Sequence, residues 1–139
     1  MTYNDDNRGV IQCRERRQQI IDASGLRFGN ITPTDCDGLI EYKDKAYVLF
    51  EIKYRDAPVP KGQLVALKRS IDDYARAGKH AVLIIAEHEV DNLAQDIIAA
   101  ICKVRTYYYH GTWYKKECTL KDFIEKVIAF VAVSSRLCN

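Results

Sequence analysis

The sequence has no long hydrophobic run, no strong excess of one charge and no closely spaced pair of cysteines. No stretch approaches the roughly 20 apolar residues of a membrane-spanning helix, and the polar residues 1–8 lack the apolar core of a signal peptide. We therefore expect a cytoplasmic protein with no membrane partner. The net charge of +2 does not indicate a nucleic-acid binder by itself, so such a surface would need local clustering of basic residues.

The spacing of the cysteines and the small number of prolines exclude further classes of structure. The five cysteines are scattered along the chain without a C-x-x-C pair, which excludes a local zinc ribbon or iron–sulfur motif and favours reduced thiols. The chain has only three prolines, no internal repeat and no low-complexity linker. With 139 residues, of which 47% are hydrophobic and 29% charged, it is predicted to form one domain over residues 1–139 with its own core.

Hydrophobic periodicity and turn residues predict an α/β fold with an αβββαβ core. We expect a mixed central sheet flanked by helices, with an extra strand and helix at the C-terminal end. The continuous apolar run at 80–86 is typical of a buried strand that pairs in parallel with an earlier one. Helices are predicted over residues 9–24, 61–78, 91–101 and 119–133, and strands over residues 26–31, 37–43, 46–54, 80–86 and 103–110.

The most informative strand is predicted at residues 46–54. Because strand side chains alternate between faces, Leu49, Glu51 and Lys53 share one face, and both faces begin apolar. The sheet is therefore expected to be covered on both sides, with a polar end at Glu51 and Lys53. A carboxylate and an ammonium in that place are costly to desolvate without partners, and a bound cation and a phosphate would be such partners.

A hairpin closed at residues 44–45 is expected to bring Asp37 to the same end of the sheet. Position 37 would then pair near Ile52, so that Asp37 lies beside Glu51 and Lys53. Two neighbouring carboxylates repel each other unless a divalent cation lies between them, and their hard oxygens favour Mg²⁺ or Mn²⁺. With the Ile52 carbonyl as a further ligand, such an ion would polarise a phosphate and activate water, while Lys53 would position that water and stabilise negative charge.

Asp37-Gly38, Glu51-Ile52-Lys53 and Gln63, in this order, resemble the PD-(D/E)xK nuclease superfamily. The resemblance covers roughly residues 14–88 and implies a restriction-endonuclease-like core, in the RecB-like or Holliday-junction-resolvase-like branch. It implies that Asp37 and Glu51 bind the metal and that Lys53 is catalytic.

The same resemblance extends to the two flanking helices. It implies that Glu15 on the preceding helix helps to hold the metal and that Gln63 on the following helix acts with the catalytic residues. Tyr74 would lie on the same helix face as Gln63, about three turns later. The family's Pro-Asp dipeptide is absent, so Asp35 and Asp37 compete for the metal, and Asp37 is favoured because a glycine and a strand follow it.

Each of these residues also has an ordinary structural interpretation. Glu51 and Lys53 could form a solvated salt pair, and Asp37 could simply open a turn before Gly38. Glu15 could pair with the arginines around it, and Gln63 could be a surface residue. The ordinary interpretation of Tyr74 is a core side chain.

Basic and aromatic residues form local groups that would suit nucleic acid. Arg17, Lys61, Lys68 and Arg69 on the predicted helices are candidate phosphate contacts. A late group could stack on unpaired bases and contact phosphates; it consists of Tyr107, Tyr108, Tyr109, Trp113, Lys115 and Lys116.

The predicted function is Mg²⁺-dependent hydrolysis of DNA phosphodiester bonds, as an endonuclease or exonuclease that could work as a homodimer. The alternative is a catalytically silent module with the nuclease fold that binds nucleic acid or inhibits a protein partner. The intact set of Asp37, Glu51 and Lys53 argues against a silent site. The late aromatic group favours the alternative, since it could be a protein-binding patch.

Overall fold

The computed structural model describes residues 20–137, and the chain divides into two units after Pro33. In the first unit, residues 20–33 form turns and one β-bridge, in which the main chains of Phe28 and Ile31 exchange hydrogen bonds of 2.9 and 3.0 Å. The prediction of a single domain over residues 1–139 stays a prediction.

Two predicted elements of the first unit are not formed as expected. Residues 20–24 are not helical, because the Asp22 carboxylate accepts the Ser24 N–H at 2.9 Å and stabilises a turn instead. Residues 26–31 form the single bridge rather than a strand, since Gly29 with φ of 63° turns the chain back on itself. The rest of the predicted first helix, with Glu15 and Arg17, lies outside the described residues.

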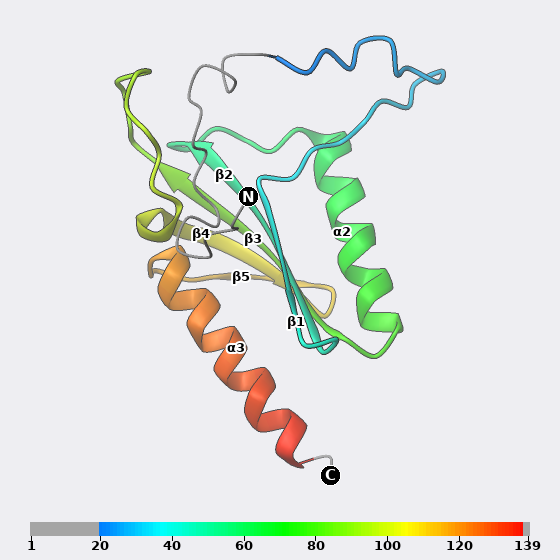
Figure 1. Cartoon of the computed structure of the whole chain (residues 1–139), viewed down its shortest axis with the longest axis vertical. Coiled ribbons are helices and arrows are strands. Elements are labelled where there is room, and N and C mark those ends of the chain that lie inside the picture. The colour runs from blue at the N-terminus through cyan, green and yellow to red at the C-terminus, as the bar shows by residue number, and fades with distance from the viewer. Residues whose placement is uncertain (1–19, 138–139) are drawn as a thin grey trace, which may run out of the picture. The chain divides into compact units, whose positions relative to one another are not determined.

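The second unit is α/β, with a five-stranded mixed sheet in the order β1-β2-β3-β4-β5 and two α-helices (Figure 1). Strands β2 and β3 are parallel, and the other three neighbouring pairs are antiparallel. The bounds are β1 Gly38–Tyr42, β2 Ala46–Tyr54, α2 Lys61–Arg76, β3 His80–His88, the 3₁₀ helix η2 Ala99–Ile101, β4 Lys103–Tyr109, β5 Thr112–Lys115 and α3 Leu120–Leu137.

The sheet is covered on both faces, which confirms that expectation. One face of β2 and β3 packs against α2, through a core that consists of Leu49, Leu67, Ile71, Ala81, Leu83, Ile85 and Tyr108. The opposite face packs against the first half of α3, through Val48, Val82, Ile84, Val104, Leu120 and Phe123. We call these two sides the α2 face and the α3 face. Glu51 and Lys53 lie on the α2 face, because they alternate in register with Leu49.

The parallel pair β2 and β3 is also as expected. Pro58 and Pro60 precede α2, and Gly78 with φ of 87° follows it, so the helix is a short crossover between the two strands. β3 is buried from Ala81 to Ala86 on both faces, as its continuous apolar sequence predicts. Both strands therefore end at the same edge of the sheet, at Tyr54 and His88.

The structure corrects three further predictions. Residues 91–101 contain only η2 instead of a helix, because the Asn92 side chain and main chain accept the N–H groups of Ala94 and Gln95 in a turn. β5 was not predicted, although His110 and Gly111 with positive φ form a two-residue hairpin turn between β4 and β5. Only two strands precede α2, so the described order is ββαβ followed by ββα.

The hairpin of β1 and β2 differs from the expected one by a single position. Its turn spans residues 43–45, with positive φ at Lys43 and Asp44. Gly38 consequently pairs with Phe50, and position 37 lies opposite Glu51 rather than Ile52. Among the described residues, no helix is long and apolar enough to cross a membrane.

Candidate active site

A cysteine holds the loop before β1 against β2. The Cys36 thiol lies 3.1 Å from the Gly38 carbonyl oxygen and 3.6 Å from that of Phe50, as a donor to both. Cys36 also packs against the core of the α2 face, and this burial raises the pKa of its thiol. The loop is thereby fixed with Asp35 and Asp37 on either side of the anchor. Sequence reasoning had given Cys36 no role beyond that of a reduced thiol.

Asp37 is bound to the main chain of β2. Its Oδ2 accepts the Ile52 N–H at 2.7 Å, in the place where a longer β1 would have offered a carbonyl. The glycine that follows is required by close packing, because a Cβ at Gly38 would lie 2.1 Å from the Phe50 ring. The carboxylate of Asp37 is therefore held immediately before the first residue of β1, opposite Glu51.

Glu51 is the one buried charged residue among those described, with 2% of its surface exposed. Burial, together with a hydrogen bond to Asp37 and the charge of that residue, raises the pKa of Glu51 to about 7, while the charge of Lys53 opposes the shift. Asp35 adds a smaller repulsion. Near neutral pH this carboxyl group is therefore poised between its protonated and ionised forms, a condition that a neighbouring cation would resolve in favour of the ionised form.

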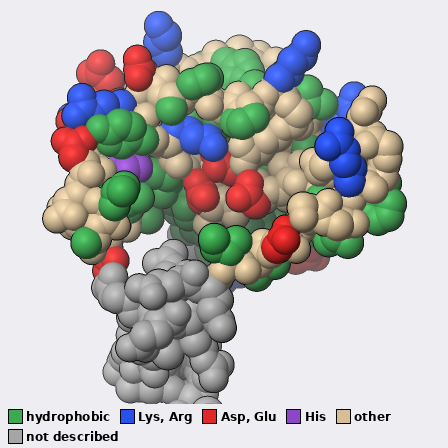
Figure 2. Space-filling model, turned by 90° about the horizontal axis from the view of Figure 1, so that it is seen from above, with side chains coloured by type: hydrophobic (Ala, Val, Ile, Leu, Met, Phe, Trp, Pro, Cys, Tyr) green, Lys and Arg blue, Asp and Glu red, His purple; other side chains and the backbone are tan. Residues whose placement is uncertain are grey.

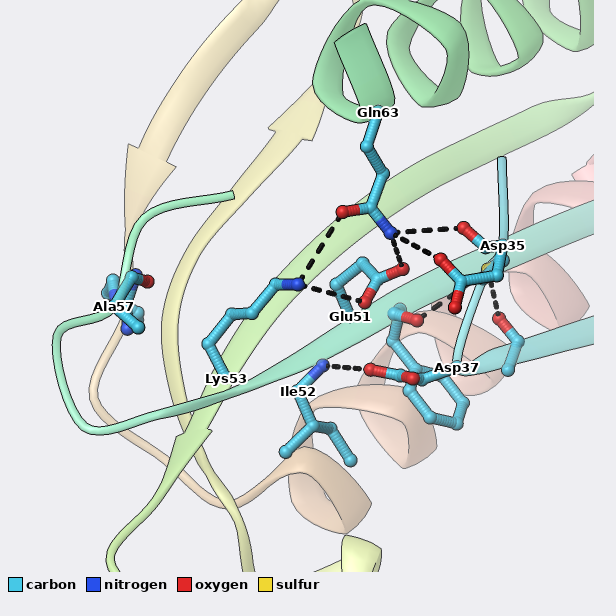
Figure 3. A network of polar contacts seen from close by, with 11 residues as sticks. Asp35, Asp37, Glu51, Ile52, Lys53, Ala57 and Gln63 are labelled. Atoms are coloured by element: carbon cyan, nitrogen blue, oxygen red, sulfur yellow. Dashed lines mark hydrogen bonds and ion pairs between the residues drawn. The ribbon is translucent and has the colours of Figure 1, made fainter. Parts of the chain in front are cut away.

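Gln63 joins the aspartates to the strand, as Figure 3 shows. Its Nε2 lies 3.1 Å from both the main-chain oxygen and Oδ1 of Asp35, and it also donates to Oε1 of Glu51. Its Oε1 is 3.5 Å from Lys53 Nζ, which in turn lies 3.9 Å from Glu51 Oε2. Gln63 stands in the first turn of α2, so the start of this helix is part of the site.

The oxygen-rich donor set fits a divalent cation. No group of three or more His, Cys, Asp or Glu side chains that could hold a metal is found within residues 20–137. Mg²⁺ is nonetheless commonly held by only one or two carboxylates, with water or substrate completing its shell. Asp37 and Glu51 would form such a pair, because a cation between them would relieve the charge repulsion that raises the pKa of Glu51. Asp35 lies at the rim of the same cluster, bonded to Gln63.

The other predicted residues are placed differently. Tyr74 stacks on Tyr47 with ring centroids 4.1 Å apart and packs against the core, so it is not part of the cluster around Glu51. Lys61 and Arg69 are exposed on α2. Lys68 Nζ lies 5.1 Å from the centre of the Tyr108 ring.

Arg105 supports the site from a distance, and sequence reasoning missed it. From β4 its guanidinium donates to the main-chain oxygens of Arg55 and, at 3.1 Å, of Ala57, and it pairs with Glu87 at 3.3 Å. These contacts hold the connection between β2 and α2, in which Ala57 is labelled in Figure 3. Because Gln63 lies in the first turn of α2, Arg105 indirectly helps to position it. No sequence signal could have found this residue, because its partners lie far away along the chain.

Figure 2 looks onto the end of the molecule at which β2 ends, and acidic side chains gather near the middle of this view, beside basic ones. No protein-family model, curated protein or solved structure matches the chain. The chemistry of this site therefore has to be inferred from its geometry.

Proposed function

We propose that the chain is a Mg²⁺- or Mn²⁺-dependent nuclease of the PD-(D/E)xK type, which hydrolyses phosphodiester bonds of nucleic acid, DNA in the first place. The observation that carries the proposal is the buried carboxylate of Glu51, raised in pKa beside Asp37 and within 3.9 Å of Lys53. A restriction-endonuclease-like arrangement is part of the proposal, supported by the order β1, β2, α2, β3 around these residues.

The metal ligands proposed are Asp37 and Glu51, with the Ile52 carbonyl as a third. The Ile52 N–H faces Asp37, and the N–H and C=O of one strand residue point to the same edge of the strand. A bound Mg²⁺ would supply Lewis-acid activation of the phosphate and of a water molecule. Asp37 keeps one oxygen on the strand, so its carboxylate stays fixed beside Glu51. Glu15, outside the described residues, stays a predicted ligand.

Lys53 is proposed to hold the attacking water and to stabilise negative charge on the reacting phosphate. Its side chain is 22% exposed, so the ammonium lies between the buried carboxylate and solvent. Gln63 accepts a hydrogen bond from it and keeps it close to Glu51. The ammonium of Lys53 thus separates the buried carboxyl group of Glu51 from solvent, while Asp37 is exposed beside them and is open to an approaching cation and phosphate.

The test is a cleavage assay with Mg²⁺ or Mn²⁺ on duplex, single-stranded and branched DNA and on RNA. Lys53→Ala, Glu51→Gln and Asp37→Asn should each abolish cleavage. Lys45→Ala is the matched control, since Lys45 is an exposed lysine before the other end of β2. Calorimetric titration with Mn²⁺ should show binding that Glu51→Gln and Asp37→Asn lose and Lys45→Ala keeps.

The assay also decides the alternative of a silent binding module. If the wild-type chain binds nucleic acid but cuts none of these substrates with either metal, the nuclease proposal is wrong. If it cuts them and the three variants cut equally well, the assignment of the site is wrong. Sedimentation of the same preparations measures whether the predicted homodimer forms.

A further inference from the structure

A row of charged residues continues from the candidate active site across the sheet. Lys53 pairs in register with Glu87 on β3, and Glu87 pairs with Lys103 on β4. On β5, Lys115 pairs with Thr106 of β4, which itself lies opposite Ile85 on the α2 face. Directly opposed residues share a face, so Lys53, Lys103 and Lys115 lie on the same side of the sheet. At about 4.8 Å between strands, the row spans about 14 Å.

Helix α2 packs over β2 and β3 and reaches β4 at Tyr108. The connection before α2 lies against Arg105 of β4. Where β4 begins and β5 ends, these strands and the chain after them line a hollow of about 800 Å³. Basic residues at this hollow are Lys103, Arg105, Lys115 and Lys116, and acidic ones are Glu87, Glu117 and Asp122.

The lysines of the hollow are available to an anionic partner. Arg105 and Glu87 neutralise each other at 3.3 Å. Asp122 stands in the first turn of α3, where the helix dipole already stabilises a negative charge. Within residues 20–137, Lys103, Lys115 and Lys116 take part in none of the ion pairs. Their charges would be neutralised by the phosphates of a bound strand.

An aromatic platform lies beside the lysines. Trp113, the only tryptophan of the chain, is 36% exposed and shares the face of Lys115, two residues away. Its ring rests on Tyr108, with centroids 5.3 Å apart. Tyr108 is itself fixed by a 2.7 Å hydrogen bond to Asp72 and by Lys68, 5.1 Å from the ring. Trp113 therefore packs on a fixed tyrosine ring, and part of its own side chain remains exposed to solvent.

We propose that a single-stranded stretch of the nucleic-acid substrate crosses the sheet from Lys53 toward β5, with phosphates on Lys103 and Lys115 and one base stacked on Trp113. This rests on the proposed nuclease function, because it identifies the strand entering that site. An unpaired base is required, since bases in a duplex are already stacked on each other and offer no free ring face to Trp113. The basic row supplies the backbone contacts, and the tryptophan supplies the preference for single strands.

The single tryptophan makes the proposal measurable at one site. In EDTA, where cleavage does not interfere, a short oligothymidine should quench Trp113 fluorescence, and a duplex of equal length should quench it much less. An oligouridine in parallel tells whether the strand is DNA or RNA. Trp113→Leu, which keeps apolar packing on Tyr108, should weaken binding of a fluorescently labelled oligothymidine about tenfold in anisotropy. Trp113→Phe should lose less.

The lysines are tested by salt dependence. Lys103→Ala and Lys115→Ala should each reduce the slope of log K against log salt concentration by about 0.7. Trp113→Leu should weaken binding without changing that slope, and Lys45→Ala should change neither quantity. Thermal melts of all variants establish that each is folded before its binding is measured.

The outcomes separate this inference from the nuclease proposal. Cleavage by the wild type together with unchanged binding by the Trp113 and lysine variants would overturn the inference and leave the nuclease intact. Tight duplex binding without fluorescence quenching would also overturn it. If single strands quench the wild type, Trp113→Leu binds them more weakly in anisotropy, and no condition gives cleavage, the binding surface stands and the nuclease proposal is overturned.

Discussion

Replacing Glu51 by glutamine should stabilise the metal-free protein at neutral and higher pH. The substitution nearly preserves the shape of the side chain and removes the ionisable group that is 2% exposed. The wild-type pKa of this carboxyl is raised from 4.5 to about 7. A carboxyl with a raised folded pKa stabilises the fold most below its unfolded pKa, and that contribution is lost as pH rises through the folded pKa.

The magnitude follows from the shift in pKa. A shift of about 2.5 units corresponds to about 3 kcal/mol of unfolding free energy at the full effect. Glu51→Gln carries no such pH-dependent cost. The difference in unfolding free energy, variant minus wild type, should therefore increase by up to about 3 kcal/mol between pH 4.5 and 7 and level off above it. The attraction of Lys53 is already contained in this shift, because it lowers the pKa of Glu51.

The assay is urea denaturation of both proteins in EDTA at several pH values across this window. Adding Mg²⁺ should stabilise the wild type and leave Glu51→Gln unchanged, because binding to the folded state alone raises its stability. Glu89→Gln, an exposed carboxylate just after β3, is the matched control and should show a nearly constant difference. A difference for Glu51→Gln that is flat or falls as pH rises would refute the argument.

Three more predictions concern packing around the site. Gly38→Ala places a methyl group 2.1 Å from the Phe50 ring, so we expect a loss of about 1–3 kcal/mol, measured by denaturation, and weaker Mn²⁺ binding. Arg105→Met keeps most of the side-chain volume but leaves the Ala57 oxygen without its donor; cleavage should fall more than stability, and equal loss of both would contradict the positioning role. Ile71→Ala in the core should cost about 2–5 kcal/mol in denaturation without changing the metal affinity of the folded protein.

Local patterns in the sequence determined much of the fold and the centre of the site. The alternation over β2 correctly predicted that Leu49 and Val48 face separate cores and that Glu51 ends one of them. The prolines before α2 and Gly78 after it predicted a crossover helix and a parallel β3. Such features could be predicted because they depend on periodicity, backbone freedom and burial, which a residue and its near neighbours decide.

Other elements depended on turn conformations that the residue pattern did not reveal. The apolar residues at 91–101 have the spacing of a helix, but a turn at Asn92 pairs the main-chain N–H groups of Ala94 and Gln95 instead. The register that puts position 37 opposite Glu51 depended on the positive φ of Lys43 and Asp44. A shift of one position in a strand is invisible to composition, because both registers pair similar residue types.

Glu51-Ile52-Lys53 could be identified from the sequence as a polar end on a buried strand, and burial at 2% agrees with it. What the sequence could not determine was the surrounding support: the Cys36 anchor, the bond from Asp37 to the strand, and Gln63 between Asp35 and Glu51. These contacts join residues from a loop, a strand and a helix. Only the tertiary structure brings them together, because hydrogen bonds and charge repulsion depend on distances in space rather than on order along the chain.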